Sequence, residues 1–137
     1  MSERLQAFRE FRRTMNEKIL ASDNLVIKRF FNLDTQTYHP GHLPTRVKEM
    51  LGLVASLVLR CDDCITYHLM RCKEEGVTRD ELFEVLSVGL VVGGSIVIPH
   101  LRRAVATWEE LEREQEQSQG RPPAAAAPRH RADSETR

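Results

Sequence analysis

Residues 49–68, EMLGLVASLVLRCDDCITYH, decide the fold of this chain. The run from Leu51 to Leu59 is apolar on nearly every side of a helix, so a helix there must be covered all round. A turn is expected near Arg60, and a second helix is expected to begin at about Cys61 or Asp62. Two helices joined by so short a turn form a helical hairpin.

The rest of the sequence predicts more helices and no strand of any length. Apolar residues recur three and four positions apart near the N-terminus, Thr78–Glu81 forms a capping box, and Gly93-Gly94 separates the last two helices. The stretch DTQTYHPGHLP, residues 34–44, contains two prolines and a glycine and predicts a loop. We therefore expect an all-α fold, a compact bundle of about five to six helices, over residues 3–21, 24–33, 44–58, 61–75, 78–92 and 95–114.

The C-terminal part of the chain differs from the rest in composition. From about Gln115 to Arg137 the sequence contains GRPPAAAAPRHR and no periodic apolar face, which predicts a disordered tail after one domain at residues 1–114. Two segments of that domain, Leu51–Leu59 and Val85–Ile98, are too apolar for a chain of this size to cover completely. We therefore expect part of the second segment to face another copy of the chain in a homo-oligomer.

The charge balance and the N-terminal sequence narrow the class of protein. The chain has 20 lysine and arginine residues and 20 aspartate and glutamate residues, so no basic surface indicates nucleic-acid binding. Charges are scattered through the N-terminus where a secretory signal would be apolar, and no apolar run approaches the ~18 residues of a membrane span. We expect a cytoplasmic protein without nucleic-acid or membrane partners, in which a cysteine pair is more often catalytic or metal-binding than structural.

Two of the three cysteines, Cys61 and Cys64, lie three residues apart at the start of a predicted helix. Residues i and i+3 of a helix have Cβ atoms about 5–6 Å apart, and a disulfide accepts Cα separations of about 4.4–6.8 Å. The pair can therefore alternate between dithiol and disulfide with little backbone movement. The free N–H groups and the dipole of the helix N-terminus stabilise a thiolate there, whereas Asp62 and Asp63 disfavour it.

His68 and Glu49 are the candidate proton carriers beside this pair. His68 lies one turn beyond Cys64 on the same helix face, so its imidazole can accept the thiol proton or, when protonated, hold the thiolate. Glu49 is about ten residues before the hairpin turn and His68 about nine after it, which places them at the same level. A carboxylate beside so apolar a stretch needs a partner, because burying it unpaired is costly. We therefore predict a Glu49–His68–Cys64 relay of orienting acid, base and nucleophile.

The same residues form a pattern that resembles a known family. Glu-x11-Cys-x2-Cys-x3-His, fulfilled by Glu49, Cys61, Cys64 and His68, resembles the active-site signature of the alkylhydroperoxidase D-like branch of the carboxymuconolactone decarboxylase family. The resemblance covers about residues 43–110, including the stretch VTRDELFEVLSVGLVVGG after the site. Decarboxylases of the family typically lack the cysteine pair, so the pair favours the redox branch.

The resemblance implies an all-helical fold assembled as trimers or hexamers, and the reduction of small hydroperoxides by thiols. In that reaction Cys64 would attack the peroxide, Cys61 would resolve the sulfenic acid, and Glu49 and His68 would relay protons. A dithiol donor of the lipoyl or thioredoxin type would return the electrons, with no bound cofactor and no resident metal. Some peroxidase members carry a histidine just before the second cysteine, where this chain has Asp63, a difference that bears more on peroxide turnover than on thiol–disulfide exchange.

Two other classes of function remain open from the residues alone. A lyase or isomerase on the same fold would use His68 and Glu49 as acid and base. A non-enzymatic module would use the cysteines for redox sensing, or would bind zinc through Cys61, Cys64 and His68, with His100 as a fourth ligand.

The other singled-out residues favour structural roles. Cys72 lies about two turns past Cys64, too far for a disulfide within the chain, and is expected in the core or on the surface. His39 and His42 in YHPGH are expected to be loop residues. The phenylalanine pairs at 8 and 11 and at 30 and 31 are expected to make core or subunit contacts.

Overall fold

The computed structural model describes residues 1–120, which form six α-helices and one 3-10 helix and contain no β-strand. The prediction of an all-α fold is therefore confirmed. The elements in chain order are α1 (Glu3–Leu20), α2 (Leu25–Thr37), α3 (Thr45–Val58), α4 (Asp62–Glu74), α5 (Arg79–Gly93), η1 (Ser95–Val97) and α6 (Ile98–Ser118).

The second helix is longer than the sequence predicts. α2 continues to Thr37, so the first four residues of the predicted loop 34–44 are helical and the prediction is wrong there. These residues contain no proline or glycine, and the first helix-breaking residue is Pro40. The hydroxyls of Thr35 and Thr37 donate to carbonyls one turn earlier, which is how a helical threonine satisfies its side chain.

The last helix also continues past its predicted end. α6 reaches Ser118, four residues beyond Glu114, although this part of the chain has no apolar face. Glutamate and glutamine are good helix formers, and the Met1 ammonium donates to the Gln117 side chain at 2.7 Å. Most of the predicted disordered tail, residues 121–137, lies outside the described part of the chain.

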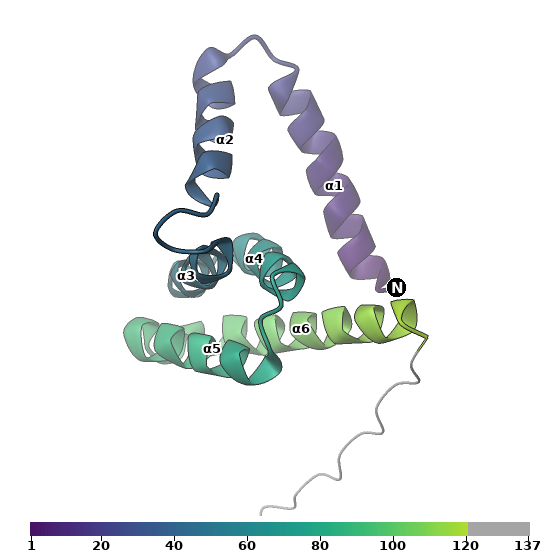
Figure 1. Ribbon diagram of the computed structural model, residues 1–137, viewed down its shortest axis with the longest axis vertical. Coiled ribbons are helices and arrows are strands. Elements are labelled where there is room, and N and C mark those ends of the chain that lie inside the picture. Colours follow the sequence, from purple (N-terminus) through teal and green to yellow (C-terminus); the bar gives the residue numbers. More distant parts are fainter. Residues whose placement is uncertain (121–137) are drawn as a thin grey trace, which may run out of the picture.

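Helices α3 to α6 form what we call the bundle, which contains nearly all of the core. α3 packs against both α4 and α5, and α6 packs against α4. In Figure 1, α3 and α4 lie above a layer made of α5 and α6. Trp108 of α6 is fully buried in the bundle, with its indole N–H donating to Glu112 at 2.9 Å. The other buried apolar residues are Leu53, Leu57, Ile65, Leu69, Cys72, Val77, Leu82, Leu86, Val97, Ala104 and Leu111.

Two turns hold α4 between its neighbours. Arg60 adopts a left-handed conformation with φ of 60° between α3 and α4, and the Cys61 N–H donates to the Ser56 carbonyl at 3.1 Å. Gly76 has φ of 74° and follows the C-terminal end of α4, as predicted. The predicted capping box is also present, because the Thr78 side chain accepts from the Glu81 N–H and the Glu81 side chain accepts from the Thr78 N–H.

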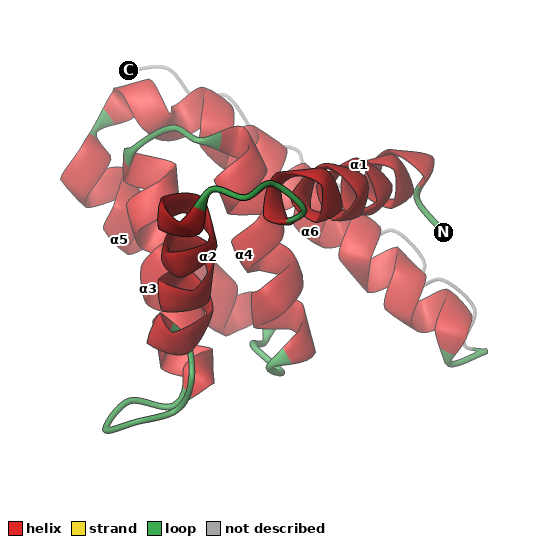
Figure 2. Ribbon diagram, turned by 90° about the horizontal axis from the view of Figure 1, so that it is seen from above, coloured by secondary structure: helices red, strands yellow, loops and turns green. Residues whose placement is uncertain are grey.

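Helices α1 and α2, which we call the arm, project from the bundle and converge at the loop that joins them (Figures 1 and 2). Leu5 is the single buried residue of the two helices, so the predicted apolar stripe of α1 reaches the core only there. The start of α1 is fastened to α6 by an Arg9–Glu114 ion pair of 2.8 Å and by the Ser2 hydroxyl, which donates to Glu110. Exposed large apolar residues of the arm are Phe11, Met15, Leu20, Leu25, Val26, Ile27, Phe30 and Leu33.

The second apolar surface lies on α5 and η1. Val88, Val91, Val92 and Ile96 are more than half exposed, so residues 1–120 leave part of the segment Val85–Ile98 uncovered. That another copy covers it stays a prediction. No helix within residues 1–120 is long and apolar enough to cross a membrane.

Candidate active site

The two cysteines of the motif form a disulfide at the start of α4. Cys61 is the N-cap residue, and its Cα lies 5.2 Å from that of Cys64 on the first helical turn. The Cys61 sulfur accepts the Cys64 N–H at 3.3 Å, so one of the unpaired donors of the helix N-terminus already points at sulfur. Cys64 is an exposed residue, and Cys61 is half-buried.

Glu49 and His68 form a buried pair across the α3–α4 hairpin. The Glu49 carboxylate oxygen Oε2 accepts from Nδ1 of His68 at 2.7 Å, and Oε1 accepts from Nε of Arg71 at 3.4 Å. Only 1% of Glu49 is exposed to solvent. Two cationic or polar partners thus satisfy a carboxylate that would otherwise be costly to bury. The contact between Glu49 and His68 agrees with the equal distances of the two residues from the hairpin turn.

The other ring nitrogen of His68 faces Tyr38. Nε2 lies 3.5 Å from the hydroxyl oxygen of Tyr38, the C-cap residue of α2, and the two rings are 5.4 Å apart. The ring of Tyr67 also meets His68 edge-on, with the ring centroids 5.2 Å apart. Within residues 1–120 no hydrogen bond joins His68 to either sulfur. The structure therefore brings Glu49 and His68 together and adds Tyr38, whereas the link to Cys64 stays a prediction.

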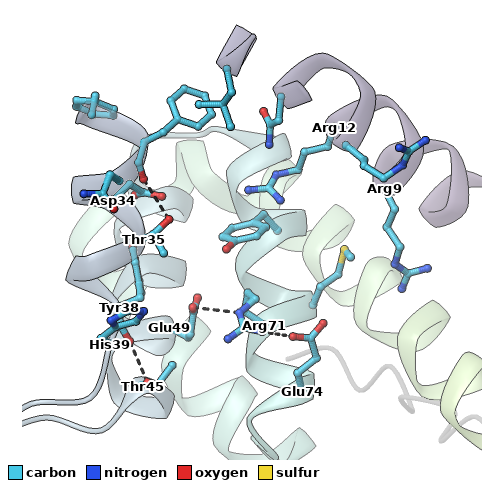
Figure 3. Close-up of a pocket in the computed structure, with 18 of the residues that line it drawn as sticks. Arg9, Arg12, Asp34, Thr35, Tyr38, His39, Thr45, Glu49, Arg71 and Glu74 are labelled. Atoms are coloured by element: carbon cyan, nitrogen blue, oxygen red, sulfur yellow. Dashed lines mark hydrogen bonds and ion pairs between the residues drawn. The ribbon is translucent and has the colours of Figure 1, made fainter. Parts of the chain in front are cut away.

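A cavity of about 1250 Å³ opens between the arm and the bundle, and Glu49 lies at its floor (Figure 3). Tyr38, Glu49, Tyr67 and Arg71 line the floor, and α1 and α2 form the sides. The Arg12 guanidinium reaches from α1 over the Tyr67 ring, 3.9 Å from its centroid, in a cation–π contact. The aromatic residues of the arm that line the cavity are Phe8, Phe30 and Phe31.

The first residue of α4, Asp62, is hydrogen-bonded to two residues of α6. The Asp62 carboxylate accepts from Nδ1 of His100 at 2.7 Å and from Arg103 at 3.2 Å. The Arg103 guanidinium offsets part of the negative charge of Asp62 beside Cys61, while Asp63 is exposed. His100 is therefore connected to the site through its hydrogen bond to Asp62. Residues 1–120 hold no group of three or more His, Cys, Asp or Glu side chains placed to bind a metal ion.

Comparison with known proteins identifies the family of this chain. Residues 25–107, more than half of the chain, match the sequence model of the carboxymuconolactone decarboxylase family. The chain belongs to this family. The match covers α2 to the middle of α6 and leaves out α1, so it includes Tyr38, the disulfide and the Glu49–His68 pair.

Solved structures of other carboxymuconolactone decarboxylase family members have the same fold. One is a family protein of Thermotoga maritima with a suggested involvement in the antioxidative response; it is 55% identical, with a TM-score of 0.76 over 87% of this chain and 99% of that one. A family protein of Legionella pneumophila is 22% identical, with a TM-score of 0.72 over 80% of this chain and 97% of that one, which supports the fold alone.

A curated relative matches a shorter part of the chain. An uncharacterized protein of Cupriavidus necator is 31% identical over 71 residues, which are 52% of this chain and 63% of that protein. The chain thus spans less than two thirds of the length of this relative.

The remaining candidate residues of this family member lie away from the disulfide. Cys72 is fully buried in the core, where desolvation raises the pKa of its thiol to about 12. His39 and His42 are exposed in the loop before α3, as predicted. Phe11 and Phe30 are both 68% exposed, so neither belongs to the core of this chain.

Three residues of the site were missed from the sequence. Tyr38 and Arg71 touch His68 and Glu49, and Gly52 lies against both His68 and Tyr38. Arg71 is three residues after His68 on α4, a spacing that would have placed it near Glu49 once the hairpin was assumed. Tyr38 had no such signal, because the loop that sets its position has no periodicity.

Proposed function

We propose that this member of the carboxymuconolactone decarboxylase family is a thiol-dependent peroxidase or disulfide oxidoreductase. The observation that carries the proposal is the Cys61–Cys64 disulfide on the first turn of α4, with the buried Glu49–His68 pair one turn behind it. A disulfide that is part exposed and sits at a helix N-terminus has the position expected of a redox-active pair.

The proposed cycle begins with the reduced pair. The Cys64 thiolate attacks the outer oxygen of a hydroperoxide, the O–O bond breaks, and Cys64 becomes a sulfenic acid. A proton passed through Glu49 and His68 converts the departing alkoxide to an alcohol. The Cys61 thiol then attacks the sulfenic sulfur, which forms the disulfide and releases water. An external dithiol reduces the disulfide and is itself oxidised, so one hydroperoxide is consumed for each dithiol.

The two sulfurs suit different parts of this cycle. Cys64 is the more exposed residue of the pair, as suits the cysteine that meets a hydroperoxide or an incoming reductant. The Cys61 sulfur accepts the Cys64 N–H, a contact that stabilises Cys61 as the departing thiolate when a reductant attacks Cys64. We assign Cys64 as the nucleophile and Cys61 as the resolving thiol on these grounds.

Two further observations support the proposal. The Thermotoga maritima relative, with its suggested involvement in the antioxidative response, is 55% identical over most of this chain. The exposed apolar residues of the arm and of α5 also favour the homo-oligomer, a trimer or hexamer, that the resemblance implies. A lipoyl-type or thioredoxin-type protein is the proposed electron donor, and the cytoplasm is the proposed compartment.

Thiol counting tests the proposal directly. The reduced chain has three thiols, and one equivalent of an alkyl hydroperoxide should remove two of them. Cys72→Ala, a substitution at the buried cysteine, should leave the same two-thiol loss, whereas Cys64→Ser should abolish peroxide consumption. Full peroxide consumption by Cys64→Ser would refute the assigned nucleophile. One tightly bound zinc per chain with masked thiols would favour the metal-binding module.

A lyase or isomerase is the second candidate, and one observation favours it. His68 turns Nε2 toward Tyr38, which lines the large cavity together with Glu49, so Glu49 and His68 could act on a substrate there without the cysteines. This candidate predicts that hydroperoxide removes no thiols. It also predicts that a cysteine-free variant keeps its activity while Glu49→Gln loses it.

A further inference from the structure

The position of Tyr38 beside His68 is fixed from several sides. Tyr38 is the C-cap residue of α2, and its carbonyl accepts from the Thr45 hydroxyl at 2.9 Å. The Lys48 ammonium donates to the carbonyls on either side of it, those of Thr37 at 2.9 Å and His39 at 2.7 Å. The backbone of Tyr38 is thus fastened to α3, the helix that carries Glu49, although its side chain comes from the arm.

Gly52 provides the space in which the two side chains meet. A Cβ atom at Gly52 would lie 2.6 Å from Cε1 of His68, 2.7 Å from the Tyr38 hydroxyl oxygen and 2.8 Å from Nε2 of His68. No side chain fits at that position without moving both groups. Glycine inside a helix costs about 1 kcal/mol relative to alanine, so its presence in the middle of α3 needs a packing reason. The contact between Tyr38 and His68 is such a reason.

The hydrogen-bonding roles of the imidazole follow from its two neighbours. An ionised carboxylate can only accept a hydrogen bond. Nδ1 of His68, 2.7 Å from the Glu49 oxygen, must therefore carry a proton and donate it in that hydrogen bond. In the neutral ring Nε2 is then an acceptor, and the Tyr38 hydroxyl is the donor facing it. Burial and the charge of Glu49 raise the pKa of Tyr38, which keeps the hydroxyl proton in place at neutral pH. The separation of 3.5 Å is long, as is common before a substrate is bound.

We propose that Tyr38 is a positioning residue for His68: its hydroxyl donates to Nε2 and holds the imidazole in place against Glu49, and this contact depends on the absence of a side chain at Gly52. This role rests on the proposed proton relay, and it extends that relay from Glu49 and His68 to a residue of the arm.

The two tyrosines of the chain provide a matched pair of variants. Both rings touch His68, but only the Tyr38 hydroxyl faces an imidazole nitrogen. We would label histidine with ¹⁵N and record the ring nitrogens of His68 in the oxidised protein at neutral pH. The wild type should show a protonated Nδ1 and an unprotonated, hydrogen-bonded Nε2. Tyr38→Phe should move the Nε2 signal toward that of a free imine nitrogen, and Tyr67→Phe should leave it in place.

A pair of glycine variants makes the same test without removing the hydroxyl. Gly52→Ala should displace the imidazole from Tyr38 and move the Nε2 signal as Tyr38→Phe does. Gly41→Ala is the control, because a Cβ there would meet only the Lys48 ammonium at an ordinary 3.8 Å. Should Gly52→Ala fail to fold, the tyrosine pair alone decides the question.

The kinetic measurement separates this proposal from the function it rests on. Tyr38→Phe should slow the oxidation of the reduced cysteine pair by an alkyl hydroperoxide about three- to tenfold, the value of one neutral hydrogen bond. An unchanged Nε2 signal in Tyr38→Phe, or a wild-type ring protonated at Nε2, would overturn the role of Tyr38. A wild-type protein that does not react with hydroperoxide, but whose variants show the expected Nε2 shifts, would instead refute the proposed peroxidase activity. The proposed contact between Tyr38 and His68 would remain supported.

Discussion

The arm and the bundle have similar apolar residues but use them differently. In the bundle, leucines such as Leu53, Leu57 and Leu69 are fully buried, whereas α2 of the arm buries no residue at all. Hydrophobic stabilisation depends on the apolar area removed from water, so the two regions contribute unequally to the stability of a single chain. The arm nevertheless brings Tyr38 to His68 and encloses the cavity. The bundle therefore maintains the fold, and the arm shapes the site.

The largest expected effect is on the free energy of unfolding, which a substitution in the bundle should lower far more than one in the arm. Trp108→Ala removes a fully buried ring from the bundle and should lower the free energy of unfolding by about 3–5 kcal/mol. Phe30→Ala, at a 68% exposed position of the arm, should change it by less than about 0.5 kcal/mol in the monomer. Urea titration at low protein concentration measures both. A large loss in Phe30→Ala that grows with protein concentration would show that the arm is buried by another copy.

A pH titration of stability tests whether water reaches Cys72 in the core of the bundle. Burial raises the pKa of Cys72 from its ordinary 9.0 to about 12, so the folded thiol stays neutral where the unfolded one ionises. The stability from this group is complete below pH 9 and is lost as the pH rises from 9 toward 12, by at most about 4 kcal/mol. The free energy of unfolding of wild type should fall relative to that of Cys72→Ala between pH 9 and 11. Parallel curves for the two proteins would mean that water reaches Cys72.

Removing one helix cap in each region should have a smaller effect on stability, and this effect should also differ between bundle and arm. Thr78 caps α5 in the bundle and Asn24 caps α2 in the arm, each by accepting a backbone N–H. Thr78→Ala should reduce global stability by about 1 kcal/mol, because α5 unfolds together with the core. Asn24→Ala should loosen only the first turn of α2, visible as faster amide exchange there. Equal losses in global stability would show that arm and bundle unfold as one unit.

The smallest effect concerns the joint between the regions. Lys48 of α3 donates to two carbonyls at the end of α2, and Lys48→Met removes both bonds while keeping most of the side-chain length. Amide exchange in the last turn of α2 should become several-fold faster, with the core amides unchanged. No change in exchange would indicate that the Thr45 hydroxyl bond to Tyr38 is sufficient to hold the joint.

Much of the fold and part of the site followed from local sequence rules. The capping box at Thr78, the glycine after α4 and the start of α4 at Asp62 depend on residues a few positions apart, so they could be predicted. Glu49 and His68 could be paired because a short hairpin fixes which residues are level. The predicted end of α2 was wrong because the loop prediction weighted Pro40 and Gly41 above the helix-permitting residues before them. The predicted end of α6 was wrong because glutamate and glutamine continue a helix that has no apolar face.

The sequence by itself determined an all-helical chain, a cysteine pair able to form a disulfide on the first turn of a helix, and a glutamate level with a histidine. These features depend on helix geometry, which repeats every few residues. Only the tertiary structure decided that Tyr38 meets His68 over Gly52, that His100 pairs with Asp62, and that the arm leaves a cavity above Glu49. Each of these contacts joins segments whose relative placement depends on loops and long-range packing, for which the sequence contains no periodic signal.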